Sequence, residues 1–295
     1  MPIVDSQVHI WAASTPERPW PARHAPHREP PLGPDELLRL MDRAGVDGAI
    51  LVPPSWEGER NDLVLAAAAR HPTRFAAMGR LDPGDPDLSA RLAGWREQPG
   101  MLGLRFSLHR PGMAQALENG AMDAVWQGAE RHGVPVMLLL PQARMPVIGT
   151  IAARYPGLRL VLDHLGVPSS VPVEQRFRDM DALLALAAYP NVAVKASALP
   201  CLSLMPYPHP DLAAPLRLTF AAFGARRMFW GSDLSRLPCS YRAAVDMLPH
   251  ALPDLDAEDR AWVMGKGICE WLGWHRPHDA VTPAPGAFES GHAAA

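Results

Sequence analysis

Gln7 and His9 are the first polar pair in the sequence that could do chemistry, and they stand near the end of the apolar run "IVDSQVHIW". Residues two apart on a β-strand point to the same face, so the amide and the imidazole are expected side by side. A histidine there can bind a metal ion or transfer a proton, whereas a glutamine is a weak metal ligand and a good hydrogen-bonding group. The pair therefore raises three alternatives: a metal site, an altered metal site, or a site that works without metal.

Other apolar runs also end in charged or imidazole side chains. These residues are Arg105 with nearby His109, Asp163 with His164, Lys195 with Ser197, and Ser232 with Asp233. Unpaired charges at the ends of buried strands would be costly in a core, so their common position favours one shared site. Each residue also has a structural alternative: a hydrogen-bonded core histidine for His9, a helix cap for Asp233, surface charges for Arg105 and Lys195, and orientation of His164 for Asp163.

The elements that must position these residues follow one repeated pattern, a short apolar run, a polar loop and an amphipathic segment. Strands are predicted over 3–10, 46–54, 74–82, 101–107, 134–141, 158–166, 191–197 and 227–235. Helices are predicted over 34–45, 59–72, 86–98, 121–133, 145–157, 177–190 and 210–224. Eight such units in 295 residues predict an α/β fold, a single-domain (β/α)8 TIM barrel, with its site at the C-terminal ends of the strands. The alternative, an open doubly wound sheet, lacks a glycine-rich turn after the first strand.

Two segments depart from the repeat. Residues 12–34 contain seven prolines and no clear period, which favours a long loop over the barrel mouth. Residues 275–295 are small, polar and proline-containing, so a tail is expected after a barrel domain that spans 1–274.

The composition limits the classes of binding partner that are expected. A net charge of -3 with 20% charged residues gives no reason to expect a nucleic acid or an anionic membrane surface. The three cysteines have no metal-binding or disulfide spacing, and no leader or long apolar run is visible, so a cytoplasmic protein with a small-molecule substrate is expected. A homodimer is compatible with a barrel of this size, although no specific apolar seam indicates one.

Four motifs, "VDSQVHIW", "LDHLG", "VKAS" and "WGSDLSRLP", together resemble the amidohydrolase superfamily. The resemblance is to the branch of lactone hydrolases that includes 2-pyrone-4,6-dicarboxylate hydrolase and the sugar lactonases, and it spans almost the whole chain to about Trp274. It implies the same barrel and hydrolysis of a carboxylic ester in a ring.

Matched to the histidine and aspartate pattern of that family, His9, His164 and Asp233 are present. Gln7 occupies the position of the first histidine, and the fifth predicted strand offers none. A hydrolytic zinc usually has three strong protein ligands, so we expect no tightly bound metal and no other cofactor. If a divalent ion such as zinc does bind, the resemblance places it at His9, His164 and Asp233.

A metal-free lactonase needs a base for water, donors to the carbonyl oxygen and an anchor for the substrate. Asp233 is the expected base, and His9, His164 and Gln7 are the expected donors. Arg105 and Lys195 are expected to bind a substrate carboxylate, with His109 and Arg236 as further anchors.

Two other functions stay open at this stage. The first is metal-dependent decarboxylation of an aromatic or unsaturated acid, which a sister branch of the superfamily performs. The second is a barrel that has lost its ligands and only binds a partner.

Overall fold

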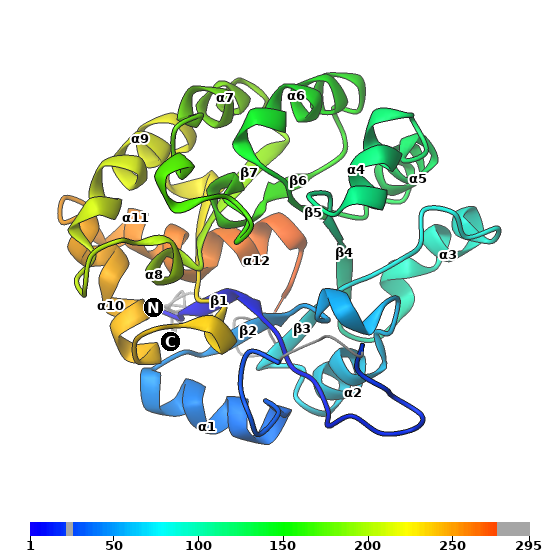
Figure 1. The fold of residues 1–295 in the computed structure, drawn as a ribbon, viewed down its shortest axis with the longest axis horizontal. Coiled ribbons are helices and arrows are strands. Elements are labelled where there is room, and N and C mark those ends of the chain that lie inside the picture. The colour runs from blue at the N-terminus through cyan, green and yellow to red at the C-terminus, as the bar shows by residue number, and fades with distance from the viewer. Residues whose placement is uncertain (22–25, 276–295) are drawn as a thin grey trace, which may run out of the picture.

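The computed structural model describes residues 1–21 and 26–275, and within them eight parallel strands form one sheet in sequential order. The strands are β1 (Val4–Val8), β2 (Gly48–Leu51), β3 (Phe75–Gly79), β4 (Met101–Ser107), β5 (Val136–Leu139), β6 (Leu160–Leu162), β7 (Val192–Ser197) and β8 (Met228–Gly231). Every strand is buried along its whole length, as expected when both faces of a parallel sheet are covered. The prediction of a (β/α)8 barrel is confirmed (Figure 1).

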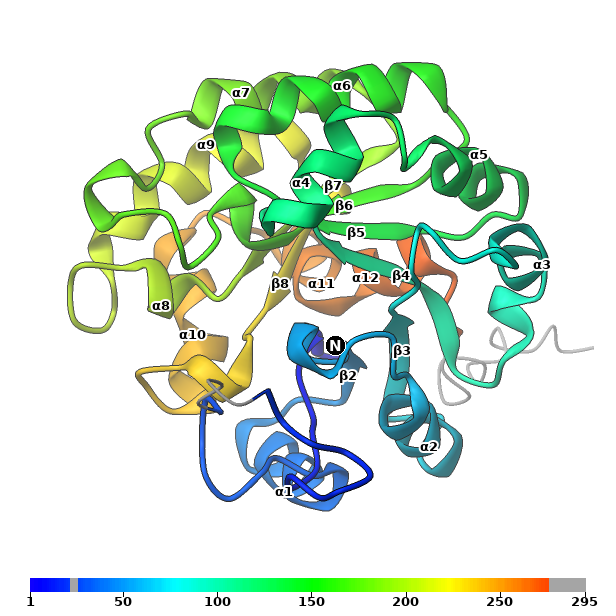
Figure 2. The same cartoon turned by 45° about the vertical axis from the view of Figure 1, so that its right-hand side comes forward.

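Most of the helices lie around the outside of the strands and cover the sheet (Figures 1 and 2). They are α1 (Pro34–Ala44), α2 (Asp62–Arg70), α3 (Leu88–Ala93), α4 (Pro111–Glu118), α5 (Asp123–Arg131), α6 (Met145–Arg154), α7 (Met180–Leu184), α8 (Leu199–Leu202), α9 (Ala213–Phe223), α10 (Tyr241–Ala251), α11 (Ala257–Ala261) and α12 (Gly267–Leu272). All seven predicted helices are present. The sequence pattern missed α4, α8 and the three helices that follow β8.

Helix α1 shows how local sequence sets these elements. Pro34 stands at its first position, where a missing N–H costs nothing, and Gly45 ends it with a left-handed φ of 72°. Leu37 and Met41, four residues apart, are fully buried against the barrel.

Asp5 joins the first and last strands. This fully buried carboxylate accepts hydrogen bonds from the Ser232 backbone N–H (2.8 Å), the Ser232 hydroxyl and the Tyr241 hydroxyl (2.7 Å). The Asp233 backbone N–H also donates to the Gln7 carbonyl at 2.9 Å. These contacts fix the segment after β8 against β1, and they thereby set the relative position of Asp233 and His9.

The segment expected to cross the barrel mouth does so in its described part. The Trp11 N–H donates to the Leu32 carbonyl (3.2 Å), and Trp20 packs edge-on against Trp56. His27 contacts Ser235 at 3.0 Å, which links this loop to the segment after β8. The expected tail lies outside the described residues except for His275, and no helix in the described chain is long and apolar enough to cross a membrane.

Candidate active site

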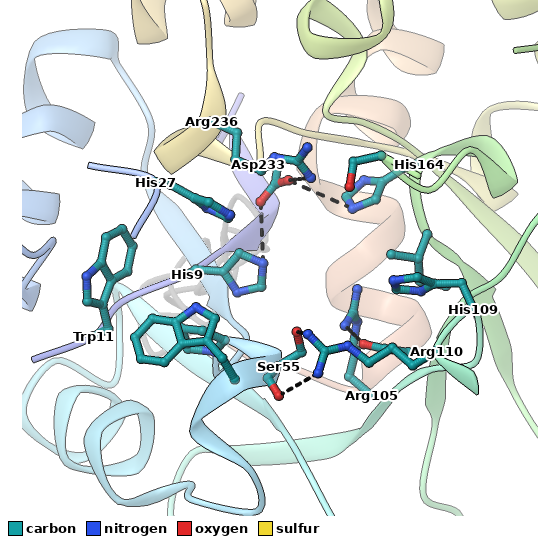
Figure 3. A pocket seen from close by; sticks show the side chains of 15 residues that line it. His9, Trp11, His27, Ser55, Arg105, His109, Arg110, His164, Asp233 and Arg236 are labelled. Atoms are coloured by element: carbon teal, nitrogen blue, oxygen red, sulfur yellow. Dashed lines mark hydrogen bonds and ion pairs between the residues drawn. The ribbon is translucent and has the colours of Figure 1, made fainter. Parts of the chain in front are cut away.

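A pocket of about 200 Å³ opens at the C-terminal ends of the strands, as a barrel enzyme requires (Figure 3). Its lining is His9, Trp11, His27, Pro54, Ser55, Trp56, Arg105, Ser107, His109, Arg110, Leu139, His164, Ser169, Asp233 and Arg236. Six of the eight predicted site residues belong to this lining. The other two, Gln7 and Lys195, are fully buried and lie outside it.

Asp233 is the buried carboxylate of the pocket. Its Oδ1 lies 3.4 Å from His9 Nε2, and its Oδ2 lies 4.0 Å from His164 Nε2 and 3.7 Å from Arg236 (Figure 3). Oδ1 accepts no hydrogen bond within the described structure. A buried acceptor without a donor is costly, so this oxygen is placed to receive a proton-bearing group that enters the pocket.

The backbone turns sharply at two of these residues. Asp233 has φ 53° and His164 has φ 55°, both in the left-handed region that costs a non-glycine residue about 1 kcal/mol. Each lies two residues beyond a short strand, Asp233 after β8 and His164 after β6. The strand predicted to continue to Gly166 ends at Leu162. Each of these strands is therefore followed by a turn at a left-handed residue, and the side chain of that residue lies in the pocket.

The hydrogen bonds of His9 fix its tautomer. Its Nδ1 lies 2.7 Å from the Val52 carbonyl, which can only accept, so Nδ1 carries the proton. Its Nε2 lies 3.3 Å from the Gln7 amide nitrogen and accepts from it. Neutral His9 therefore presents a lone pair, and no N–H, towards Asp233.

His164 is held by β7. Its Nδ1 lies 2.8 Å from the Ser197 hydroxyl, and that hydroxyl also receives the His164 backbone N–H at 3.3 Å. When the hydroxyl donates to Nδ1, the remaining ring proton lies on Nε2, which faces Asp233 and the pocket.

Burial sets the protonation of these three groups. Loss of solvent lowers the pKa of His9 and of His164 to about 4, against the opposing effect of Asp233. Burial alone would raise the pKa of Asp233, but the charges of nearby groups outweigh it and the pKa is lowered. His9 and His164 contribute most to this lowering, followed by Arg236, the neighbour that stays charged when both imidazoles are neutral.

Beneath the pocket lies a buried group of charges. Lys195 Nζ is 2.7 Å from Asp163 Oδ1 and 2.5 Å from Gln7 Oε1, and Asp163 Oδ2 accepts from Arg105 Nε at 3.0 Å. Lys195 was expected to bind substrate, but it has no exposed surface and its ammonium faces the barrel interior. The physical reason is depth: Lys195 stands two residues, about 6.6 Å, before Ser197 along β7.

The pocket wall opposite Asp233 is cationic. Arg105 reaches it from β4, and Arg110 bonds across to the hydroxyl and carbonyl of Ser55. His109 stands beside them, and burial followed by the charge of Arg105 lowers its pKa. Sequence reasoning missed Arg110, Ser55 and His27. Arg110 and His27 lie in loops and Ser55 begins a three-residue 3-10 helix, so none of them lies in a segment with a periodic signal.

The donor set does not fit a resident metal ion. The Gln7 oxygen faces the Lys195 ammonium, and the group that Gln7 turns towards His9 is an N–H donor, which cannot bind a metal. Leu139, an apolar residue that cannot bind a metal ion, stands on the pocket wall at the end of β5. Across the described chain, no three histidine, cysteine or acidic side chains are grouped so that they could hold a metal ion.

A (β/α)8 barrel with charged and imidazole side chains at the C-terminal ends of its strands has the architecture of a barrel enzyme. The family model for amidohydrolases matches residues 4–272, and the chain belongs to that family. This confirms the membership expected from the four motifs.

Two relatives are similar over most of their length. An L-fucono-1,5-lactonase of Burkholderia ambifaria is 28% identical over 239 residues, which are 79% of this chain and 81% of the relative. A 4-sulfomuconolactone hydrolase of Hydrogenophaga intermedia is 25% identical over 233 residues, 78% of this chain and 73% of the relative.

Solved structures agree on the fold. A zinc-bound amidohydrolase of Burkholderia multivorans has a TM-score of 0.78 at 22% identity, covering 92% of this chain and 99% of its own. The 5-carboxyvanillate decarboxylase of Sphingomonas paucimobilis has a TM-score of 0.54 at 19% identity, covering 81% and 82%. At these identities the likeness shows the fold alone.

Proposed function

We propose that this protein hydrolyses a lactone that carries a carboxylate, with Asp233 as general base and without a tightly bound metal. The observation that carries this proposal is Asp233 Oδ1, which accepts no hydrogen bond from the described residues and belongs to a buried carboxylate inside a pocket whose other charged side chains are cations. The two relatives named for lactones support the ester in a ring as the bond that is cleaved.

The reaction follows from the protonation states. A water molecule donates one proton to Asp233 Oδ1 while its oxygen attacks the lactone carbonyl carbon. The carbonyl oxygen becomes an oxyanion, which accepts a hydrogen bond from the Nε2–H group of neutral His164. The ring C–O bond then breaks, and Asp233 returns its proton to the leaving oxygen, which gives an open-chain hydroxy acid.

The structure changes the role expected for His9. Its only ring proton, in the neutral form, is bound to the Val52 carbonyl, so His9 cannot donate to the substrate. We propose instead that neutral His9 forms the pocket wall beside Asp233 and leaves Oδ1 accessible to water.

Metal content and turnover test the proposal together. We expect purified protein to contain well below one metal ion per chain by elemental analysis, and to open sugar-acid lactones or carboxylate-bearing ring lactones equally fast before and after chelation. About one zinc or manganese per chain, with activity lost on chelation and restored by the ion, would make His9, His164 and Asp233 ligands. That result would favour the metal-dependent decarboxylase instead. Absence of any lactone hydrolysis would favour a binding protein.

Arg110 is proposed as a carboxylate anchor beside Arg105. Arg110→Gln should lower kcat/KM for a carboxylate-bearing lactone by about 10-fold to 100-fold, the value of one lost charge-assisted hydrogen bond. An uncharged lactone of the same ring should be hydrolysed at nearly the wild-type rate. Arg39→Gln, at an exposed ion pair on α1, is the matched control and should change neither. Equal losses for both substrates would show that Arg110 supports the pocket wall rather than the carboxylate.

A further inference from the structure

Lys195, Gln7 and His9 form one hydrogen-bonded chain with a fixed direction. The ammonium of Lys195 can only donate, so Gln7 must present its Oε1, at 2.5 Å. This choice turns the Gln7 amide nitrogen to the opposite side, 3.3 Å from His9 Nε2. The orientation of the amide is thus decided by the lysine and not by the histidine.

The far end of the chain is equally constrained. The Val52 carbonyl holds the His9 Nδ1 proton at 2.7 Å, and the Gln7 N–H group faces the lone pair on Nε2. Both neighbours are satisfied by one tautomer only, the one in which Nε2 has no proton. That nitrogen lies 3.4 Å from Asp233 Oδ1, the oxygen that accepts no bond in the described structure.

We propose that Lys195 is a positioning residue that acts through Gln7 to keep a proton off His9 Nε2, so that Asp233 Oδ1 stays free to bind the attacking water. This inference rests on the proposed function. Lys195 itself touches no substrate, because it lies below the pocket with its ammonium on Asp163 and Gln7.

The expected consequence of losing the Lys195 ammonium explains its role. Without it, the Gln7 amide is free to rotate by 180° and present its oxygen to His9. An acceptor on that side favours a proton on Nε2, and the new N–H would donate to Asp233 Oδ1 at a starting distance of 3.4 Å. The base would then be hydrogen-bonded to histidine instead of water.

The test combines Lys195→Met with two variants at Gln7. Gln7→Met removes the amide but keeps the Lys195 to Asp163 ion pair, so it remains informative if Lys195→Met does not fold. Gln7→Glu keeps an oxygen for Lys195 and places a second acceptor against His9. Lys266→Met changes the only other lysine of the chain, an exposed one, and is the matched control.

Two readouts are required in the full-length protein. Nitrogen-15 NMR of the His9 ring, assigned by comparison with His9→Gln, should show the proton on Nδ1 in wild type and Lys266→Met. It should show a proton on Nε2 in Gln7→Glu. In Lys195→Met and Gln7→Met it should show a mixture of tautomers, because Asp233 Oδ1 then competes with the Val52 carbonyl for the ring proton and no Gln7 N–H group occupies Nε2. In those last two variants kcat should fall by about 10-fold to 100-fold with KM within about twofold, because substrate contacts are unchanged.

The outcomes separate this inference from the proposed function. The positioning role is overturned if the His9 tautomer or kcat is unchanged in Gln7→Met and in any folded Lys195→Met. Lactone hydrolysis by wild type would still support the proposed function in that case. If wild type hydrolyses no lactone, the proposed function fails and with it the kinetic half of this inference. The NMR result then decides the hydrogen-bonded chain alone.

Discussion

Asp233→Asn is expected to lower kcat by about 100-fold to 10,000-fold, the usual contribution of a general base. Asparagine keeps the shape of the side chain but cannot take a proton from water. Because Asp233 Oδ1 has no hydrogen-bond donor within the described structure, the substitution removes a buried charge and breaks few contacts. We therefore expect the variant to fold and to melt near the wild-type temperature, as measured by circular dichroism.

Asp246→Asn is the matched control for this loss. Asp246 pairs with Arg242 on the surface of α10, far from the proposed chemistry, so its kcat should equal that of wild type. If Asp233→Asn is well folded and keeps more than about a tenth of the activity, another group activates the water and the proposed base is wrong.

Acid is expected to destabilise the protein between about pH 6.5 and pH 4. In the unfolded chain a histidine has a pKa of about 6.5, whereas burial lowers the pKa of His9 and of His164 to about 4. In this window the unfolded state binds more protons than the folded state, so stability falls as pH falls. At about 1.4 kcal/mol per pH unit, each histidine contributes about 3 kcal/mol.

Urea unfolding at a series of pH values measures this effect. His164→Gln removes one of the two groups, so its free energy of unfolding should fall by about 3 kcal/mol less than that of wild type over the same window. His250→Gln, at an exposed position on α10, should follow the wild-type curve. Parallel curves for wild type and His164→Gln would mean that His164 is protonated at the same pH in the folded protein as in the unfolded chain.

The barrel and the outline of the site were predictable from the sequence for one reason. Strand and helix patterns are local, and the C-terminal ends of parallel strands in a barrel must converge, so residues that end the runs must meet. Arg105, His164 and Asp233 line one pocket, although Arg105 lies on β4 and the other two follow β6 and β8. The helices after β8 were missed because no later strand followed to mark their repeat.

The direction and partner of each side chain were decided only by the tertiary structure. Lys195 ends an apolar run as Asp233 does, yet it lies below the pocket because its ammonium contacts Asp163, directly after β6, and Gln7 on β1. The tautomer of His9 depends on the carbonyl of Val52, 43 residues away in sequence. Hydrogen bonds between residues distant along the chain leave no periodic signal, so the sequence by itself determined which groups gather at the mouth, and the fold decided which of them are free to react.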